Sequence, residues 1–202
     1  MGLLAKNKGN GDFDPVPEGM HKAICYGVYD LGTQFNETFG NKNHKVLLQW
    51  ELPEARIDIQ KDGEDLNLPR AQSKIYTLSL HEKANLRKDL ESWRGKSFTA
   101  TELEGFDLKN LLGVDCQLQV IHKNKNDRTF ANISLVIPAT GKKVDTENPT
   151  RFFSFEDNGI QIPDGTPEWI CKRIEESDEW KSINGVPDNQ NAPFENDDEI
   201  PF

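Results

Sequence analysis

The sequence predicts a mainly β protein built on an OB-fold, a five-stranded antiparallel barrel with a helix between its third and fourth strands. Three observations lead to this prediction. Three strand-like segments come first, one amphipathic helix follows them, and two alternating segments joined by a short polar turn come next. After the barrel, we expect one extra C-terminal helix and a disordered acidic tail.

The first three strands are expected at residues 20–30, 44–51 and 74–80, where successive side chains alternate between two faces. Gly27 lies in the middle of the first strand and predicts a bulge or a sharp bend. The glycine-containing segment 31–43 is expected to be the loop between the first two strands. A long polar stretch precedes the third strand, with a turn at 61–65.

The helix is expected to begin at Ser79, because Glu82 follows with the spacing of a capping box. Leu86, Leu90 and Trp93 form its apolar stripe, and Gly95 is expected to end it. A further short helix is predicted over residues 106–113.

Two more strands are predicted at 114–122 and 130–138, joined by a turn at 124–127. The simple alternation directs one set of side chains inward: Val114, Cys116, Leu118, Val120, Ala131, Ile133, Leu135 and Ile137. Helical spacing follows over 167–180, with Trp169, Ile170 and Ile174 predicted to face the body. The expected domain organisation is a flexible arm (1–19), the OB-fold domain (20–155), an acidic segment with a helix (156–183) and a disordered tail (184–202).

The composition fits one domain of ordinary size with a modest core. The chain has 202 residues, 35% of them hydrophobic, and a mean hydropathy of −0.71. No apolar run approaches the roughly 20 residues of a membrane helix, and the N-terminus lacks the pattern of a secretion signal. We therefore expect a cytoplasmic protein without membrane contact. Cys25, Cys116 and Cys171 are widely spaced, which argues against a disulfide framework or a zinc site, and no cofactor is expected.

The negative charge is concentrated at the C-terminal end. The chain carries a net charge of −10, but residues 1–155 hold 21 acids and 21 bases, whereas residues 156–202 hold 13 acids and three bases. A neutral body can still present a basic face. The overall charge therefore does not exclude a nucleic-acid partner for the first 155 residues.

The chain ends in an unusual peptide, ENDDEIPF, at residues 195–202, where four acids in five positions precede an apolar end, and its last six residues are DDEIPF. This end resembles the acidic C-terminal tip of bacterial single-stranded DNA-binding proteins, which finishes in acids followed by Ile-Pro-Phe. Residues 76–113 are similar, more loosely, to phage-encoded replication proteins of the same role. The bacterial proteins have a longer linker and a shorter body than this chain.

The resemblance implies a protein that coats single-stranded DNA in replication or recombination and recruits other replication and repair proteins through its tip. It implies the host-cell cytoplasm as the location if the chain is phage-encoded. Phe202 can fill an apolar pocket while its carboxylate meets a basic residue. The expected partner-binding residues are Asp197, Asp198, Glu199, Ile200, Pro201 and Phe202. The oligomeric state stays open, a homo-oligomer included.

Single-strand binding without sequence preference needs cations along the phosphates and aromatic faces for the bases. The first and last inter-strand loops and the third strand supply both. We expect nucleic-acid contacts from Phe35, Phe39, Lys42, Lys45, Arg70, Lys74, Tyr76, Lys123, Lys125, Arg128 and Phe130. For several of these residues a structural role is the alternative. Phe35 or Phe39 can close the end of the predicted barrel, and Tyr76 can belong to the core. The charged hairpin at 122–130 can simply keep the protein soluble.

Other functions are weaker interpretations of the sequence. His81 and Glu82 begin like a zinc-protease helix, but Asn85 stands where the second histidine ligand belongs. Asp107 and Lys109 form a D-x-K triplet of the kind found in metal-dependent nucleases, a pattern that arises often by chance in a chain with 29% charged residues. An adaptor or inhibitor that uses the tip to occupy host pockets, without binding DNA, is the remaining alternative.

Overall fold

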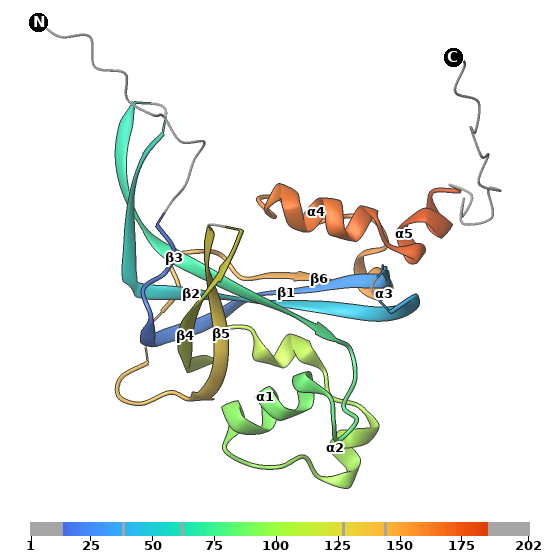
Figure 1. The fold of residues 1–202 in the computed structure, drawn as a ribbon. Helices are drawn as coiled ribbons and strands as arrows, with labels where there is room; N and C mark the ends of the chain where they lie inside the picture. The colour runs from blue at the N-terminus through green and yellow to red at the C-terminus, as the bar shows by residue number, and fades with distance from the viewer. Residues whose placement is uncertain (1–13, 38, 62, 127, 144, 186–202) are drawn as a thin grey trace, which may run out of the picture.

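The computed structural model describes residues 14–37, 39–61, 63–126, 128–143 and 145–185. The fold is mainly β, with helices between the third and fourth strands and after the sixth (Figure 1). The elements in chain order are β1 (Gly19–Asn36), β2 (Asn41–Lys61), β3 (Glu64–Thr77), α1 (Asn85–Arg94), α2 (Ala100–Glu104), the 3-10 helix η1 (Leu108–Leu111), β4 (Asp115–Lys125), β5 (Arg128–Pro138), β6 (Arg151–Phe153), α3 (Phe155–Asn158), α4 (Glu168–Glu175) and α5 (Asp178–Ile183). Residues 1–13 and the C-terminal tip lie outside the described residues.

Five strands form an antiparallel sheet in the order β3-β2-β1-β4-β5, and β6 adds in parallel to β1. β1 is central because its first part, Gly19–Ile24, pairs with β4, and its later part, from Ile24 to Asn36, pairs with β2. Cα atoms of β3 and β5 come within 8 Å of each other, but no hydrogen-bonded ladder joins these two strands in the described residues. The mainly β class is confirmed, and the sheet is open between β3 and β5.

β1 bends at Gly27, as the sequence predicts, with a register shift between Cys25 and Gly27. A Cβ atom at Gly27 would lie 2.7 Å from the Tyr29 ring and 2.9 Å from Oε1 of Gln49, so no larger residue fits without displacing them. The bulge changes the phase of the strand. Cys25 and Val28 therefore both lie in the main core, although simple alternation places them on opposite faces.

The predicted loop at 31–43 is mostly strand. β1 continues to Asn36 and β2 begins at Asn41, so only residues 37–40 connect them. The pairing continues past Gly32, a left-handed position at φ +63°, because a second register shift accommodates it. Polar side chains in this hairpin obscured its strand pattern in the sequence.

The polar stretch before the predicted third strand is also β structure. β2 runs to Lys61 and β3 starts at Glu64, so the chain reverses within the predicted turn at 61–65 and the hairpin projects as an arm (Figure 1). Asn67 accepts a hydrogen bond from Arg56 and donates one to Asp58 across the arm. These polar cross-strand bonds replace the apolar alternation on which the strand prediction depended.

The main core lies between the sheet and α1. The predicted stripe and helix end are confirmed for Leu86, Leu90, Trp93 and Gly95. The predicted start at Ser79 is wrong. α1 begins at Asn85 after Ala84, and the Ser79 hydroxyl accepts a hydrogen bond from the His81 backbone N–H in the preceding turn.

A capping box does form at α2, between Thr99 and Glu102. The short helix predicted over 106–113 is a 3-10 helix of four residues.

β4 and β5 form the predicted hairpin, with strands that extend closer to the turn than expected. A register shift between Gln119 and Val120 places an extra residue in β5. Cys116, Leu118, Val120 and Ile133 are buried as predicted, but the shift reverses the phase beyond it. Val136 is buried, and Leu135, predicted to face inward, is 38% exposed. Val114, just before β4, is also exposed rather than inward.

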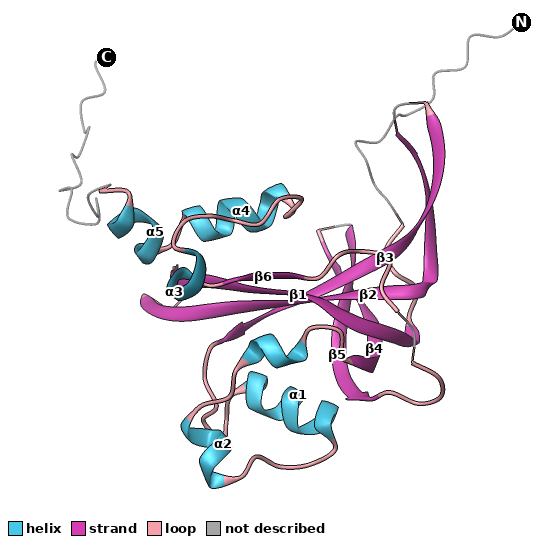
Figure 2. Ribbon diagram, turned by 180° about the vertical axis from the view of Figure 1, so that it is seen from behind, coloured by secondary structure: helices cyan, strands magenta, loops and turns pink. Residues whose placement is uncertain are grey.

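A second apolar core lies on the other face of β1 and β2, beneath α4 and α5 (Figure 2). Its buried members are Tyr29, Leu31, Leu47, Phe153, Ile170 and Ile174. The single helix predicted over 167–180 is two helices, because the Ser177 side chain accepts a hydrogen bond from the Trp180 N–H and caps α5. Trp169, predicted to face the body, is 45% exposed.

Two segments that were expected to lie loosely beside the predicted barrel pack against the sheet. The backbone N–H groups of Glu147 and Asn148 each donate a 2.8 Å hydrogen bond to the fully buried carboxylate of Glu51 on β2. At the other end, Val16 is buried in the main core, so residues 14–18 belong to the folded domain rather than to a flexible arm. No helix in the described ranges is long and apolar enough to cross a membrane.

Candidate nucleic-acid interface

Two adjoining cavities form a groove that runs from the β1–β2 hairpin to β3, the strand at the edge of the sheet. The first, of about 670 Å³, lies between the β1–β2 hairpin and α4. The second, of about 480 Å³, lies between β3 and the segment before α1. Lys45 and Ile75 line both cavities, so the groove is continuous. The predicted site residues in it are Phe35, Lys45, Lys74 and Tyr76.

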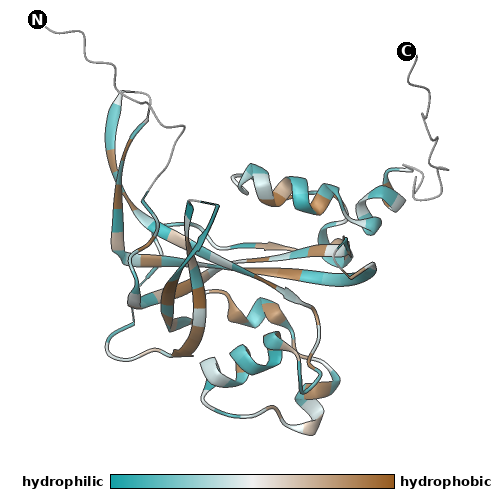
Figure 3. Cartoon of the chain, in the orientation of Figure 1, coloured by the Kyte–Doolittle hydropathy of each residue, from teal (hydrophilic) through white to brown (hydrophobic). Residues whose placement is uncertain are grey.

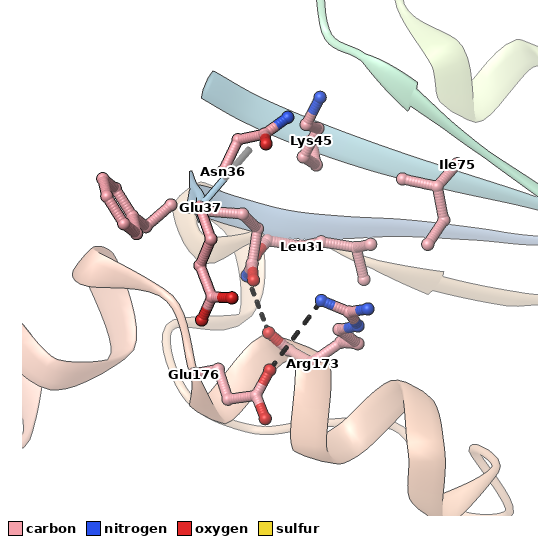
Figure 4. A pocket seen from close by; sticks show the side chains of 9 residues that line it. Leu31, Asn36, Glu37, Lys45, Ile75, Arg173 and Glu176 are labelled. Carbon is pink, nitrogen blue, oxygen red and sulfur yellow. Dashed lines mark hydrogen bonds and ion pairs between the residues drawn. The ribbon is translucent and has the colours of Figure 1, made fainter. Parts of the chain in front are cut away.

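Strand alternation explains why Lys45 and Ile75 face the groove. Leu47, two residues after Lys45, is on the same face of β2 and is covered in the second core. Ile75 of β3 pairs with Leu47 and stays 42% exposed. Leu47 is buried with Ile170 and Ile174 of α4 in the second core, whereas Lys45 and Ile75 line the first cavity beside that helix (Figure 4).

The charge in the groove is mainly positive. Lys45, Lys74, Lys83 and Arg173 line it, against Glu37 and Glu176. Lys45 donates a 2.8 Å hydrogen bond to the neutral Thr77 hydroxyl, and the Arg173 guanidinium is 4.0 Å from Glu176. These two cations are therefore weakly compensated, and a polyanion can approach them.

Lys74 is more tightly held. Its ammonium lies 2.7 Å from Asp89 of α1 and 5.3 Å from the centre of the Tyr76 ring. The Tyr76 hydroxyl donates to the same Asp89 oxygen, at 2.8 Å. Burial, followed by the nearby Asp89 charge, raises the pKa of Tyr76 far above its usual value, so the phenol stays protonated and remains a donor.

Tyr76 itself is core. Its ring is 3% exposed and packs in the main core, so its face is closed to a nucleic-acid base. A stacking role for Tyr76 does not fit this buried position, which agrees with the alternative that Tyr76 is a core residue. The phase that Tyr76 shares with Leu78 and Leu80 in the sequence is the signal for that alternative.

Phe35 is an exposed aromatic side chain that lines the groove, in contrast to the buried Tyr76. It lies near the end of β1, is 51% exposed, and pairs across the hairpin with Lys42. Phe39 is in the connection after β1 and is 76% exposed. Neither ring belongs to the two apolar cores, and Phe39 is outside the two cavities.

Lys42 is engaged by the C-terminal segment. Its ammonium lies 2.9 Å from the Asp178 carboxylate of α5. Next to it, His44 contacts Asp30 at 2.6 Å and Glu179 at 3.6 Å. The hydrogen bond with Asp30 raises the pKa of His44 above its ordinary value, and the charge of Glu179 adds to that effect.

Arg70 has a structural position. Its guanidinium donates to the backbone carbonyl oxygens of Arg56 and Asp14, which ties residue 14 to the base of the β2–β3 arm. The predicted DNA contact at Arg70 therefore competes with two intramolecular bonds.

The β4–β5 hairpin presents its predicted residues to solvent, and its end is mostly hydrophilic (Figure 3). Lys123 pairs with Phe130, and Lys125 pairs with Arg128. Phe130 is 48% exposed, in agreement with its predicted outward orientation. This hairpin extends beyond Gly19, the first residue of β1, whereas Phe35 is near the last. The expected convergence of the two loops is not seen in the groove, because neither of its two cavities contains a residue of the β4–β5 hairpin.

Asp107 and Lys109, the residues of the nuclease alternative, make contacts within the fold. Asp107 accepts a hydrogen bond from the backbone N–H of Lys109, and the Lys109 ammonium lies 4.8 Å from the centre of the Phe152 ring. His81 lines the groove beside Lys83. Across the described ranges, no group of three metal-ligating side chains comes together.

Sequence reasoning missed Ile75, Lys83 and Arg173 in the groove. Ile75 is apolar, and its sequence signal is only that of a strand residue. Lys83 belongs to a segment predicted as helix, and Arg173 is one of three cations in an acidic region. Only the packing of α4 against β1 and β2 brings Arg173 to the site (Figure 4).

Comparisons with protein-family models, with curated proteins and with solved structures found no match to this chain.

Proposed function

We propose that this protein binds single-stranded DNA without sequence specificity and recruits replication or repair proteins through its C-terminal tip. The observation that supports the DNA-binding part is the continuous groove across β3, β2 and β1. Lys45 and Lys83 line it together with the exposed side chains of Phe35 and Ile75. Cations for phosphates and apolar faces for bases are what binding of this kind requires.

We further propose that the sheet acts as an OB-fold barrel. The strand order β3-β2-β1-β4-β5, the helix between β3 and β4, and the close approach of β3 to β5 support this assignment. OB-folds bind oligonucleotides on the face of their second and third strands. The groove crosses the same two strands here.

The recruitment part of the proposal rests on the DDEIPF sequence alone. Phe202 would fill an apolar pocket on a partner while the preceding acids steer the encounter with its basic rim. The looser resemblance of residues 76–113 to phage replication proteins supports a role in phage DNA replication or recombination.

The test is fluorescence anisotropy with a labelled oligothymidylate of about 20 nucleotides, longer than the roughly 4–16 nucleotides that one OB-fold covers. We expect binding to the single strand, little sequence preference, and much weaker binding to a duplex of equal length. Affinity should fall between about 50 and 200 mM salt, with a slope of about −0.7 in log–log form for each phosphate neutralised. Absence of single-strand binding at the lower salt concentration would leave the adaptor alternative.

A further inference from the structure

The C-terminal helix α4 presents an aromatic and a cationic side chain on one flank. Ile170 and Ile174 are buried against β1 and β2, and they fix the rotation of the helix. Trp169 and Arg173 each precede one of these isoleucines by one residue, so they lie one turn apart on the same flank. Arg173 lines the first cavity, which identifies this flank as the one that faces the groove.

Arg173 is placed to contact a ligand in the groove. In Figure 4 its guanidinium extends from α4 toward the strands that carry Leu31 and Ile75. Its side chain is 54% exposed, and its ion pair with Glu176 is long, at 4.0 Å. The Gln34 side chain donates a 2.8 Å hydrogen bond to the Arg173 backbone carbonyl oxygen, which fixes this turn of α4 against β1.

Trp169 has a large exposed face with no role in the second core. It is 45% exposed, whereas Trp50 and Trp93 are buried in the main core and Trp180 packs against the second core. An exposed tryptophan next to an arginine on a fixed helix supplies a stacking face and a phosphate contact. Trp169 lies one helical turn before Arg173, toward the start of α4 and away from the hairpin end that carries Phe35.

We propose that α4 forms one wall of the single-strand site, with Trp169 stacking on a base and Arg173 contacting a phosphate. This inference rests on the proposed function and adds the path of the ligand, from Lys83 across Lys45 to Arg173 and Trp169. The acidic C-terminal region therefore contributes contacts to the nucleic acid, although its net charge opposes binding.

The experiment measures oligothymidylate binding by anisotropy and by intrinsic tryptophan fluorescence in parallel. Trp169→Ala should weaken binding by at least about fivefold, the lower limit for one stacked base. Trp169→Phe should retain most of the affinity and lose most of the fluorescence quenching. Arg173→Ala should weaken binding and reduce the salt slope by about 0.7.

Lys172→Ala is the matched control. It removes one cation from the same helix, and Lys172 is 66% exposed in an ion pair with Glu168 outside the groove. Wild-type affinity in Trp169→Ala and Arg173→Ala, in a chain that binds the oligonucleotide, would overturn this inference and leave the proposed function standing. Equal weakening in Lys172→Ala would also overturn it, because the effect would then be one of total charge. Failure of the wild-type chain to bind would overturn both proposals.

Discussion

Glu179 of α5 binds Thr33 of β1 through both of its carboxylate oxygens. One oxygen accepts a 2.6 Å hydrogen bond from the Thr33 backbone N–H, and the other accepts a 2.7 Å bond from its hydroxyl. Residues 146 positions apart are joined in this way, next to the bulge at Gly32. The C-terminal helices are therefore bound to the same hairpin that carries Phe35 and Lys42.

Loss of the Glu179 carboxylate should destabilise the folded chain. Glu179→Gln keeps the size and removes the charge, so we expect a loss of about 1.5–3 kcal/mol in the free energy of unfolding, the range for hydrogen bonds to charged groups. Denaturant unfolding measures it. Glu176→Gln is the control, since its carboxylate is 63% exposed and makes one long ion pair. An unchanged midpoint for Glu179→Gln would show that this interaction contributes little.

Stability should depend on pH through His44. Its folded-state pKa is raised by Asp30, so its contribution is fully present below the ordinary value of 6.5 and is lost as pH rises through the raised value. Burial alone would raise the pKa of Glu179, but its hydrogen bonds from Thr33 lower it, so that contribution is lost only as pH falls through the lowered value. Thermal melts at a series of pH values should therefore show a melting temperature that declines as pH rises through the raised pKa of His44. The substitution His44→Gln should remove this decline. The same alkaline decline in His44→Gln would assign the effect to another group.

Phe35, Phe39 and Phe130, the exposed phenylalanines of the described ranges, should differ in their effects on single-strand affinity. Phe35→Ala should cost about 1–3 kcal/mol of binding free energy, the range for one stacked base. Phe39→Ala should cost less, because Phe39 lies outside the two cavities. Phe130→Ala reports on the β4–β5 hairpin, and a loss as large as that of Phe35→Ala would extend the site to it. Anisotropy titrations and thermal melts together distinguish weaker binding from reduced stability.

The C-terminal tip should compete with DNA for the cationic residues. Residues 195–199 carry four acids, and a tethered anion can reach an effective concentration on the order of millimolar if its linker spans the distance. Deletion of 195–202 should tighten oligonucleotide binding at low salt and have a smaller effect at high salt, because salt screens both attractions. Phe202→Ala should leave DNA affinity nearly unchanged and abolish partner recruitment. Equal affinity of the full-length and truncated chains at low salt would leave the tip as a recruitment peptide only.

Apolar periodicity predicted the strands and the helix stripe that pack in the main core, such as Leu118 and Leu90. It failed where hydrogen bonds between polar side chains sustain strand pairing, as between Arg56 and Asn67 in the β2–β3 arm. It also failed after bulges, where one extra residue reverses the faces, as at Leu135. The order of the elements along the chain predicted the mainly β class. Whether β3 and β5 are joined by hydrogen bonds into a closed barrel depends on distances that a sequence pattern does not contain.

The candidate site was predictable only in part, for a related reason. Phe35 could be recognised as an aromatic residue in a polar segment that was predicted to be a loop. Lys45 could be recognised as a cation at the start of a predicted strand. Arg173 could not, because it reaches the groove through the packing of Ile170 and Ile174 against the second core. Lys42 was predicted from its charge, but its ion pair with Asp178 depends on the position of α5.

The most direct test of the account compares two charge-reversal pairs in the same oligothymidylate titration. Lys45→Glu with Lys83→Glu reverses two groove cations, and Lys88→Glu with Lys96→Glu makes the same charge change at exposed positions outside the groove. We expect the groove pair to weaken binding at least about tenfold more than the control pair and to flatten the salt dependence by about 0.7 for each phosphate that is no longer neutralised. Equal weakening by the two pairs would contradict binding in this groove.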